Sequence, residues 1–119
     1  MAESQTLGQV IWADLTVPDA AGVAAFYEAV VGWKAQAQEH EGGDFNMMIP
    51  GSGIAAAGVC YARGANAKLP PQWLIYVRVA DVAKSVAECE RRGGRVLGDV
   101  AGGKLLQDPA GAVMVILPG

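Results

Sequence analysis

The sequence predicts an α+β domain built from two tandem βαβββ modules. Residues 16–33 (TVPDAAGVAAFYEAVVGW) and 78–95 (RVADVAKSVAECERRGGR) superpose without a gap at an offset of 62 residues. Each half then follows the same order of one strand, one helix and three strands, and such internal repetition fixes an architecture before any motif does. With 119 residues, 52% of them hydrophobic and 18% charged, the chain can build the core of one domain. We expect a single domain over residues 1–119, with modules at about 8–61 and 73–118 and a connector at 62–72.

The first module begins with a strand at residues 10–17, where apolar and polar side chains alternate. Pro18 ends this strand, and Asp19 is a suitable N-cap for the helix that follows. Apolar residues recur at three- and four-residue spacing from Ala20 until Gly32, which ends the helix as a C′ glycine. Three strands are expected after it, at residues 33–38, 45–49 and 54–61.

The second module repeats this order after a polar connector that contains two consecutive prolines. A strand is expected at residues 73–79, and Asp81 caps a helix that ends at Gly93 and Gly94. Three strands should follow at residues 95–100, 104–107 and 112–117. The sequence DPAG at 108–111 predicts a turn before the last of them.

Alternation gives the first strand of each module two different faces. One face, with Leu15 or Val77 for example, should pack beneath the helix, and the other should point away from it. Pairing the two sheets, within the chain or across a dimer, would enclose a concave pocket lined by the second face, as small-ligand sites usually are. Alternation in residues 45–49 does not decide between Met47 and Met48. The candidate ligand-binding residues are Trp12, Asp14, Met47, Leu74, Tyr76 and Arg78, and an ordinary core role is the alternative for the apolar ones.

Residues 11–33, and above all FYEAVVGW (26–33), resemble the opening of glyoxalase, bleomycin-resistance and dioxygenase type proteins. The second half, including DPAGAVMVIL (108–117), is similar to the closing module of the same vicinal oxygen chelate superfamily. The resemblance covers nearly the whole chain. It implies paired βαβββ modules, often in homodimers, and either metal-dependent chemistry or metal-free binding of antibiotics.

The resemblance also implies places for metal ligands: a His seven residues before each capping Asp, and a Glu four residues after each late turn glycine. Counting gives Trp12 and Leu74 for the first kind of place, and Ala57 and Val115 for the second. A divalent ion needs imidazole, carboxylate or thiolate donors, which none of these residues has. A shift by one residue, for example to Gly58, does not restore a ligand. We therefore expect no metal and no other cofactor.

Two further residues are candidates for chemistry. Asp14 shares the predicted pocket face with Trp12, and a carboxylate beside an apolar wall can serve as a general acid or base because desolvation raises its pKa. An internal ion pair with Arg78, or a hydrogen bond to Tyr76 or Thr16, is the alternative. His40 is the only histidine and falls in an expected hairpin turn (38–44). A solvated turn residue is the simpler interpretation, and a metal site with Glu39, Glu41 or Asp44 is the alternative.

Composition and charge exclude several partners. The formal net charge is −3, without a clustered basic face, so nucleic acid is not expected. The N-terminal residues lack the pattern of a signal peptide, no apolar stretch approaches a membrane span, and the two cysteines, Cys60 and Cys89, stand apart. These features predict a cytoplasmic protein with no membrane partner.

The sequence thus leaves three hypotheses about function. The first is a homodimeric protein that binds a small, partly apolar organic molecule without a metal. The second is an enzyme of the same superfamily, a lyase, isomerase or dioxygenase that uses Asp14 or non-standard metal ligands. The third is a structural or regulatory domain whose pocket has collapsed.

Overall fold

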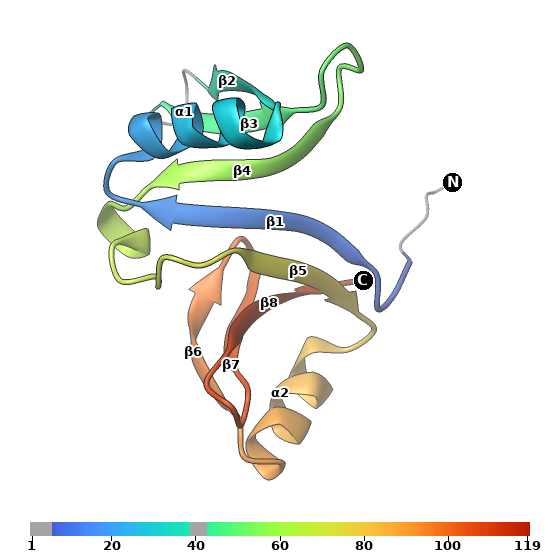
Figure 1. Cartoon of the computed structure of the whole chain (residues 1–119). Helices are drawn as coiled ribbons and strands as arrows, with labels where there is room; N and C mark the ends of the chain where they lie inside the picture. The colour runs from blue at the N-terminus through green and yellow to red at the C-terminus, as the bar shows by residue number, and fades with distance from the viewer. Residues whose placement is uncertain (1–5, 39–42) are drawn as a thin grey trace. The chain divides into compact units, whose positions relative to one another are not determined.

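The computed structural model describes residues 6–38 and 43–119, and these form the predicted elements in the predicted order (Figure 1). In the first half they are β1 (Val10–Val17), α1 (Ala20–Val31), β2 (Lys34–Gln38), β3 (Asp44–Met48) and β4 (Ala55–Tyr61). In the second half they are β5 (Leu74–Val79), α2 (Val82–Arg91), β6 (Arg95–Val100), β7 (Gly103–Gln107) and β8 (Val113–Pro118). The predicted α+β class and the repeated βαβββ order are confirmed. The connector differs slightly from the prediction, since it contains a short 3-10 helix at Gly64–Asn66.

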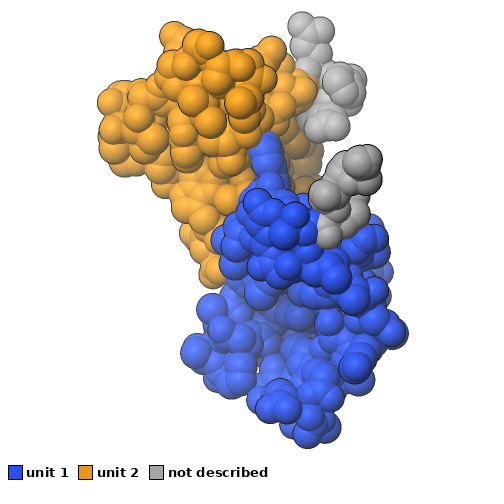
Figure 2. Space-filling view, turned by 90° about the vertical axis from the view of Figure 1, so that its right-hand side faces the viewer, with its two compact units in different colours: residues 1–12, 74–119 blue, residues 13–73 orange. Residues whose placement is uncertain are grey.

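The chain divides into two compact units, residues 13–73 and residues 74–119 together with the N-terminal segment through Trp12 (Figure 2). The strand order is β2-β3-β4-β1 in the first unit and β5-β8-β7-β6 in the second. In both units the first and last strands of the module, β1 with β4 and β5 with β8, pair in parallel, and the other pairs are antiparallel. The two units therefore repeat one topology.

Helix α1 begins and ends where the local sequence predicts. The Asp19 Oδ1 atom accepts a hydrogen bond from the Gly22 backbone N–H at 3.0 Å, which satisfies one of the unpaired donors of the first turn. At the other end Gly32 adopts a left-handed conformation with φ of 91°, and its N–H donates to the Glu28 carbonyl oxygen at 3.1 Å. Glycine is needed there because other residues rarely adopt this φ.

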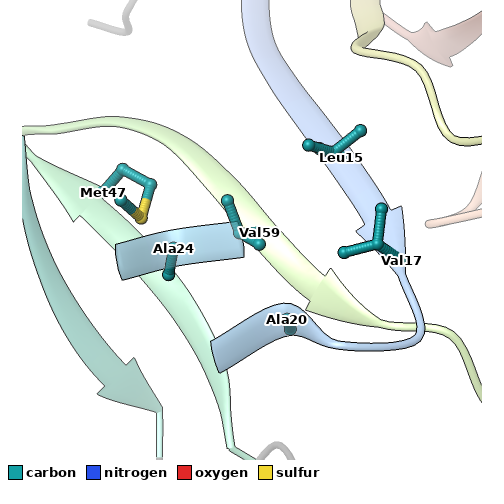
Figure 3. Close-up of a cluster of buried hydrophobic side chains, with 6 residues drawn as sticks. All are labelled: Leu15, Val17, Ala20, Ala24, Met47 and Val59. Atoms are coloured by element: carbon teal, nitrogen blue, oxygen red, sulfur yellow. The ribbon is translucent and has the colours of Figure 1, made fainter. Parts of the chain in front are cut away.

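The core of the first unit lies between α1 and one face of its sheet (Figure 3). Ala20 and Ala24 of α1 are buried against strand residues of which Met47 and Val59 are fully buried. The small alanine side chains let the helix approach the sheet closely. Tyr27 extends this core, because its ring lies 5.3 Å from the Trp73 ring and 6.0 Å from the Trp33 ring, measured between centroids. The Trp73 Nε1–H also donates to the Tyr27 hydroxyl oxygen at 3.2 Å.

Helix α2 has a similar N-terminus but a looser packing. The Asp81 Oδ1 atom accepts from the Lys84 N–H at 3.1 Å, so the predicted cap is confirmed. No residue of α2 falls in the buried class, although Val82, Val86 and Cys89 are half-buried. After the helix the chain passes close to β7, since a Cβ atom on Gly94 would lie 2.7 Å from the Gln107 carbonyl oxygen. Only glycine fits at this position.

The predicted DPAG turn precedes β8. The Asp108 Oδ1 atom accepts hydrogen bonds from the backbone N–H groups of Ala110 and Ala112, at 2.8 and 3.0 Å. Asp108 itself donates its N–H to the Ala112 carbonyl oxygen at 2.8 Å. These bonds fix the direction in which β8 leaves the turn.

Candidate functional site

Strand pairing identifies the residues on the face of the first sheet opposite α1. Leu15 and Val59 are register partners, and both belong to the core beneath α1. Asp14 and its partner Gly58 therefore point to the opposite face, because neighbouring residues in a strand alternate. The same alternation puts Trp12 and Thr16 on the face of Asp14.

The opposite face of the first unit carries a polar row across its four strands. Asp14 on β1 is in register with Gly58, Gly58 with Asn46 on β3, and Asn46 with Gln36 on β2. Asp14 and Asn46 are half-buried, whereas Gln36 is exposed. Gly58, which is itself buried, adds no side chain to this row between Asp14 and Asn46. Sequence reasoning missed Asn46 and Gln36, although alternation from a buried Met47 would have found Asn46.

The corresponding row of the second unit is apolar. Tyr76 on β5 is in register with Val115 on β8, and Val115 with Leu105 on β7. All three are buried, as is Leu74, two residues before Tyr76 on the same face. Arg78 is half-buried on that face, and its Nη1 atom donates to the Pro118 carbonyl oxygen at 3.1 Å. Equivalent rows of the two units thus differ in polarity.

Met47 lies on the other face of its sheet from Asp14. Its side chain is 0% exposed and packs in the core cluster with Ala24 and Val59 (Figure 3). Alternation then directs Met48, which is half-buried, to the face of Asp14 and Asn46. The choice between the two methionines that the sequence left open is settled by this packing.

The parallel pairs also locate the family's metal-ligand place on β4. Asp14 pairs with Gly58 in the first unit, and its equivalent Tyr76 pairs with Val115 in the second. Gly58, and not Ala57, therefore matches Val115. The difference arises from a β-bulge, since Met47 pairs with Ala57 but Met48 pairs with Ala55. Ala57 shares the helix-facing side with Met47 and Val59.

The residues at these places do not fit a divalent metal ion. Trp12, Gly58, Leu74 and Val115 offer no imidazole, carboxylate or thiolate donor. Within residues 6–38 and 43–119, no group of three or more His, Cys, Asp or Glu side chains could hold a metal ion. We derive no chemical step through a metal.

The alternative metal site around His40 lies mostly outside the described residues, which include neither His40 nor Glu39 and Glu41. Asp44 is described, and its Oδ1 atom accepts from the Tyr61 backbone N–H at 2.9 Å and from Arg63 Nη2 at 3.2 Å. The Arg63 guanidinium lies 4.9 Å from the centre of the Tyr61 ring. This carboxylate is thus engaged in holding the start of β3 to the end of β4.

The repeated βαβββ topology is the one expected for a glyoxalase-like domain. Residues 11–117 match the family model described as glyoxalase-like domain, and the chain belongs to this family. It is similar to the proteins named "Putative glyoxylase CFP32" of Mycobacterium bovis and Mycobacterium tuberculosis, with 31% identity over an alignment of 116 positions that covers 92% of the chain. The chain spans 44% of the length of these curated relatives.

Solved structures share the fold. A methylmalonyl-CoA epimerase of Streptomyces coelicolor in complex with 2-nitronate-propionyl-CoA has a TM-score of 0.51 and 20% identity, covering 96% of this chain and all of that one. A methylmalonyl-CoA epimerase in complex with methylmalonyl-CoA has a TM-score of 0.50 and 19% identity, covering 93% and 94% of the two chains. At these identities the likeness shows the fold alone. No helix in the described part of the chain is long and apolar enough to span a membrane.

Proposed function

We propose that this protein binds a small, partly apolar organic molecule without a metal, on a sheet face opposite a helix. The observation that carries the proposal is the chemistry of the four family places, which hold Trp12, Gly58, Leu74 and Val115. In place of the family's chelate these positions carry an indole, two aliphatic side chains and a glycine. Such surfaces bind by apolar contact and stacking rather than by coordination.

The two rows offer different chemical groups, each within its own unit. In the first unit Asp14 and Asn46 offer a carboxylate and an amide, which suit hydroxyl, amide or amino groups of a ligand. In the second unit the row is apolar, with Tyr76 6% exposed, Leu74 and Val115 fully buried, and Arg78 two residues beyond Tyr76. The proposal includes five of the residues that the sequence suggests, namely Trp12, Asp14, Leu74, Tyr76 and Arg78. On the first sheet Met48 takes the place proposed for Met47, whose side chain belongs to the core.

Binding is tested by tryptophan fluorescence against a library of hydroxy and keto acids, aromatic carboxylic acids and acyl-CoA thioesters. The protein has three tryptophans, and only Trp12 lies on the proposed face, because Trp33 and Trp73 pack around Tyr27. A ligand should therefore change the emission of the wild type and of Trp33→Phe, but not that of Trp12→Phe. Silence across the library would favour the collapsed-pocket hypothesis.

Metal independence is tested by elemental analysis. After dialysis without a chelator, the purified protein should hold well under one divalent ion per chain, and ligand binding should be unchanged by EDTA. A stoichiometric metal that survives dialysis and whose removal abolishes binding would contradict the proposal.

A second candidate function is catalysis by Asp14. This carboxylate is half-buried and is in register with Gly58, which has no side chain, and the curated relatives bear the name of a glyoxylase. If Asp14 acts as a general base, Asp14→Asn should lower the turnover of dicarbonyl adducts or small hydroxy and keto acids by about a hundredfold or more. Asp99→Asn, which changes a surface carboxylate of the second unit, serves as the control and should leave turnover unchanged. Equal turnover by wild type and Asp14→Asn would leave binding as the function.

Homodimer formation is also part of the proposal. Two large side chains on the outer surface of α1, Phe26 and Val30, are 56% and 64% exposed, and apolar surface of this kind is typical of protein contacts. Light scattering should give twice the mass of the chain, and Phe26→Glu should lower it to that of one chain. A monomeric wild type at micromolar concentration would overturn this part.

A further inference from the structure

An apolar pocket that is partly open to solvent lies within the second unit, on the helix side of its sheet. It adjoins the C-terminal half of α2 and has a volume of about 250 Å³. Its walls are formed by Cys89 of α2, Leu106 of β7, Met114 of β8 and Pro109 of the turn between these strands. Leu106 and Met114 are register partners, so they form one continuous apolar floor. Figure 1 shows α2 beside these strands.

The repeat explains why this space is empty. Cys89 stands 62 residues after Tyr27 and so takes the equivalent position on its helix. In the first unit the Tyr27 ring packs against two tryptophans and extends the core. A thiol is much smaller than a phenol ring, and Trp33 is replaced at the equivalent position by Arg95. The second unit therefore lacks the aromatic cluster that fills the first.

The polar groups at the rim of the cavity are already bonded within the protein. Glu88 forms ion pairs with Arg91 at 2.6 Å and with Arg92 at 3.0 Å. Gln107 accepts from Arg95 Nε at 3.0 Å, and Asp108 accepts from two backbone N–H groups of its turn. A charged or strongly polar ligand would have to break these bonds, whereas an apolar ligand would not.

We propose that this cavity binds a small neutral aromatic molecule, whose ring takes the place that the Tyr27 ring has in the first unit. Size supports this occupant, since a dry cavity of about 150 Å³ lined by apolar side chains is enough to bind benzene. The site is separate from the proposed function, because Leu106 and Met114 alternate with Leu105 and Val115, which belong to the opposite face. Either proposal can fail without the other.

Toluene is a suitable probe, and methyl NMR locates it. Titration should give saturable shifts of the Met114 and Leu106 methyl signals, while the Met47 methyl, fully buried in the first unit, stays unchanged. Benzoate at the same concentrations should give no saturable shift because its charge finds no partner at the rim. If toluene shifts the Met47 signal equally, or gives no saturable shift at Met114, the proposal is wrong.

The decisive variant places the tyrosine of the first unit at the equivalent position of the second unit. Cys89→Tyr should fill the cavity and weaken toluene binding by about tenfold or more, because a second ring would overpack the site. Ala87→Tyr adds the same side chain at an exposed position of the same helix and should leave binding unchanged. Binding to Cys89→Tyr with wild-type affinity would overturn the assignment.

A measurement on the wild-type protein covers the case in which Cys89→Tyr does not fold. Saturating toluene should slow the alkylation of Cys89 by iodoacetamide, measured by mass spectrometry of its peptide. Cys60, the other free cysteine, lies on a strand of the first unit and is the internal control, with an unchanged rate. Equal rates at Cys89 with and without toluene would contradict the proposal.

Discussion

The two helices of this protein begin with the same capping bond but cover their sheets differently. Helix α1 buries Ala20 and Ala24 against its sheet, and no residue of α2 is buried to the same degree. At the positions equivalent to these two alanines α2 has Val82 and Val86. Larger side chains at the contact keep a helix farther from its sheet. The repeat therefore preserves the frame of the module, while the packing beneath the helix is free to change.

The outer surfaces of the two helices differ in polarity. Phe26 and Val30 of α1 are exposed and apolar, whereas the equivalent residues of α2, Glu88 and Arg92, form an ion pair. Helix α1 is thus apolar on both sides, and α2 has a charged outer surface above a partly empty space. This contrast suggests contact with another protein for α1 and contact with a small molecule for α2.

The largest expected loss of stability comes from truncating a core residue of the first unit, compared with truncating a residue beside the pocket of the second unit. Met47→Ala should lower the free energy of unfolding by about 3 kcal/mol, because it removes a fully buried side chain from a closed cluster. Leu106→Ala, beside the cavity of the second unit, should cost less than about 2 kcal/mol, since Leu106 is only half-buried. Urea denaturation of both variants measures the difference. Equal losses would mean that the two helices pack equally well.

A second prediction makes the first unit resemble the second. Tyr27→Cys removes a ring that contacts Trp33 and Trp73, together with the hydrogen bond from Trp73 Nε1. The free energy of unfolding should fall by about 2 kcal/mol. The conservative variant Tyr27→Phe keeps the ring and should lose about 1 kcal/mol. If Tyr27→Cys were no less stable than Tyr27→Phe, the ring would not hold this unit together.

Local signals in the sequence predicted most of the fold. The strand at residues 10–17 was predicted with the bounds it has, and both capping aspartates form the bonds that their position before a helix implies. The turn at 108–111 is likewise held by its own aspartate. These features depend on a few adjacent residues, so the chain need not be folded for them to be recognised.

The faces of the strands were harder to predict because they depend on distant partners. Met47 and Met48 are adjacent and similar, and only the packing of α1 on the sheet distinguishes them. The bulge beside them shifts β4 by one residue, so that counting from Gly53 leads to Ala57 instead of Gly58. The polar row with Asn46 became visible only with the register of β3 and β4. The residues at the bulge, 55–57, are all alanine, so their sequence gives no indication that one of them is unpaired.

A smaller loss of stability is expected from removing the helix N-cap that the two units share. Asp19→Ala and Asp81→Ala should each cost about 1 kcal/mol, because each removes one side-chain acceptor from a first-turn N–H group. The two losses should agree, since the bonds are 3.0 and 3.1 Å long. Asp99→Ala is the control: its carboxylate is 77% exposed and pairs only with Lys104 at the surface, so its loss should be a few tenths of a kcal/mol. Unequal losses of stability would show that the capping bond contributes differently to α2, which packs more loosely, than to α1.

The smallest effect concerns the charge pair that α2 has and α1 lacks. Hydrogen bonds from the side chains of Arg91 and then Arg92 lower the pKa of Glu88 below its ordinary value. A carboxyl group whose pKa is lowered in the folded protein adds stability at pH values above its ordinary pKa. This stability is lost as the pH falls through the lowered pKa. Glu88→Gln should therefore be slightly less stable than the wild type at neutral pH, and the difference should vanish in acid.

Because Glu88 lies at the surface, salt should screen this contribution. Thermal unfolding of wild type and Glu88→Gln at neutral and acidic pH, each at low and high ionic strength, measures it. Glu90→Gln, two residues further along the same exposed helix, is the control and should show no matching pH dependence. A stability difference that persisted in acid or in high salt would mean that Glu88 acts by packing over the rim of the pocket and not by its charge. Glu88 and the equivalent Phe26 would then differ in how their side chains pack.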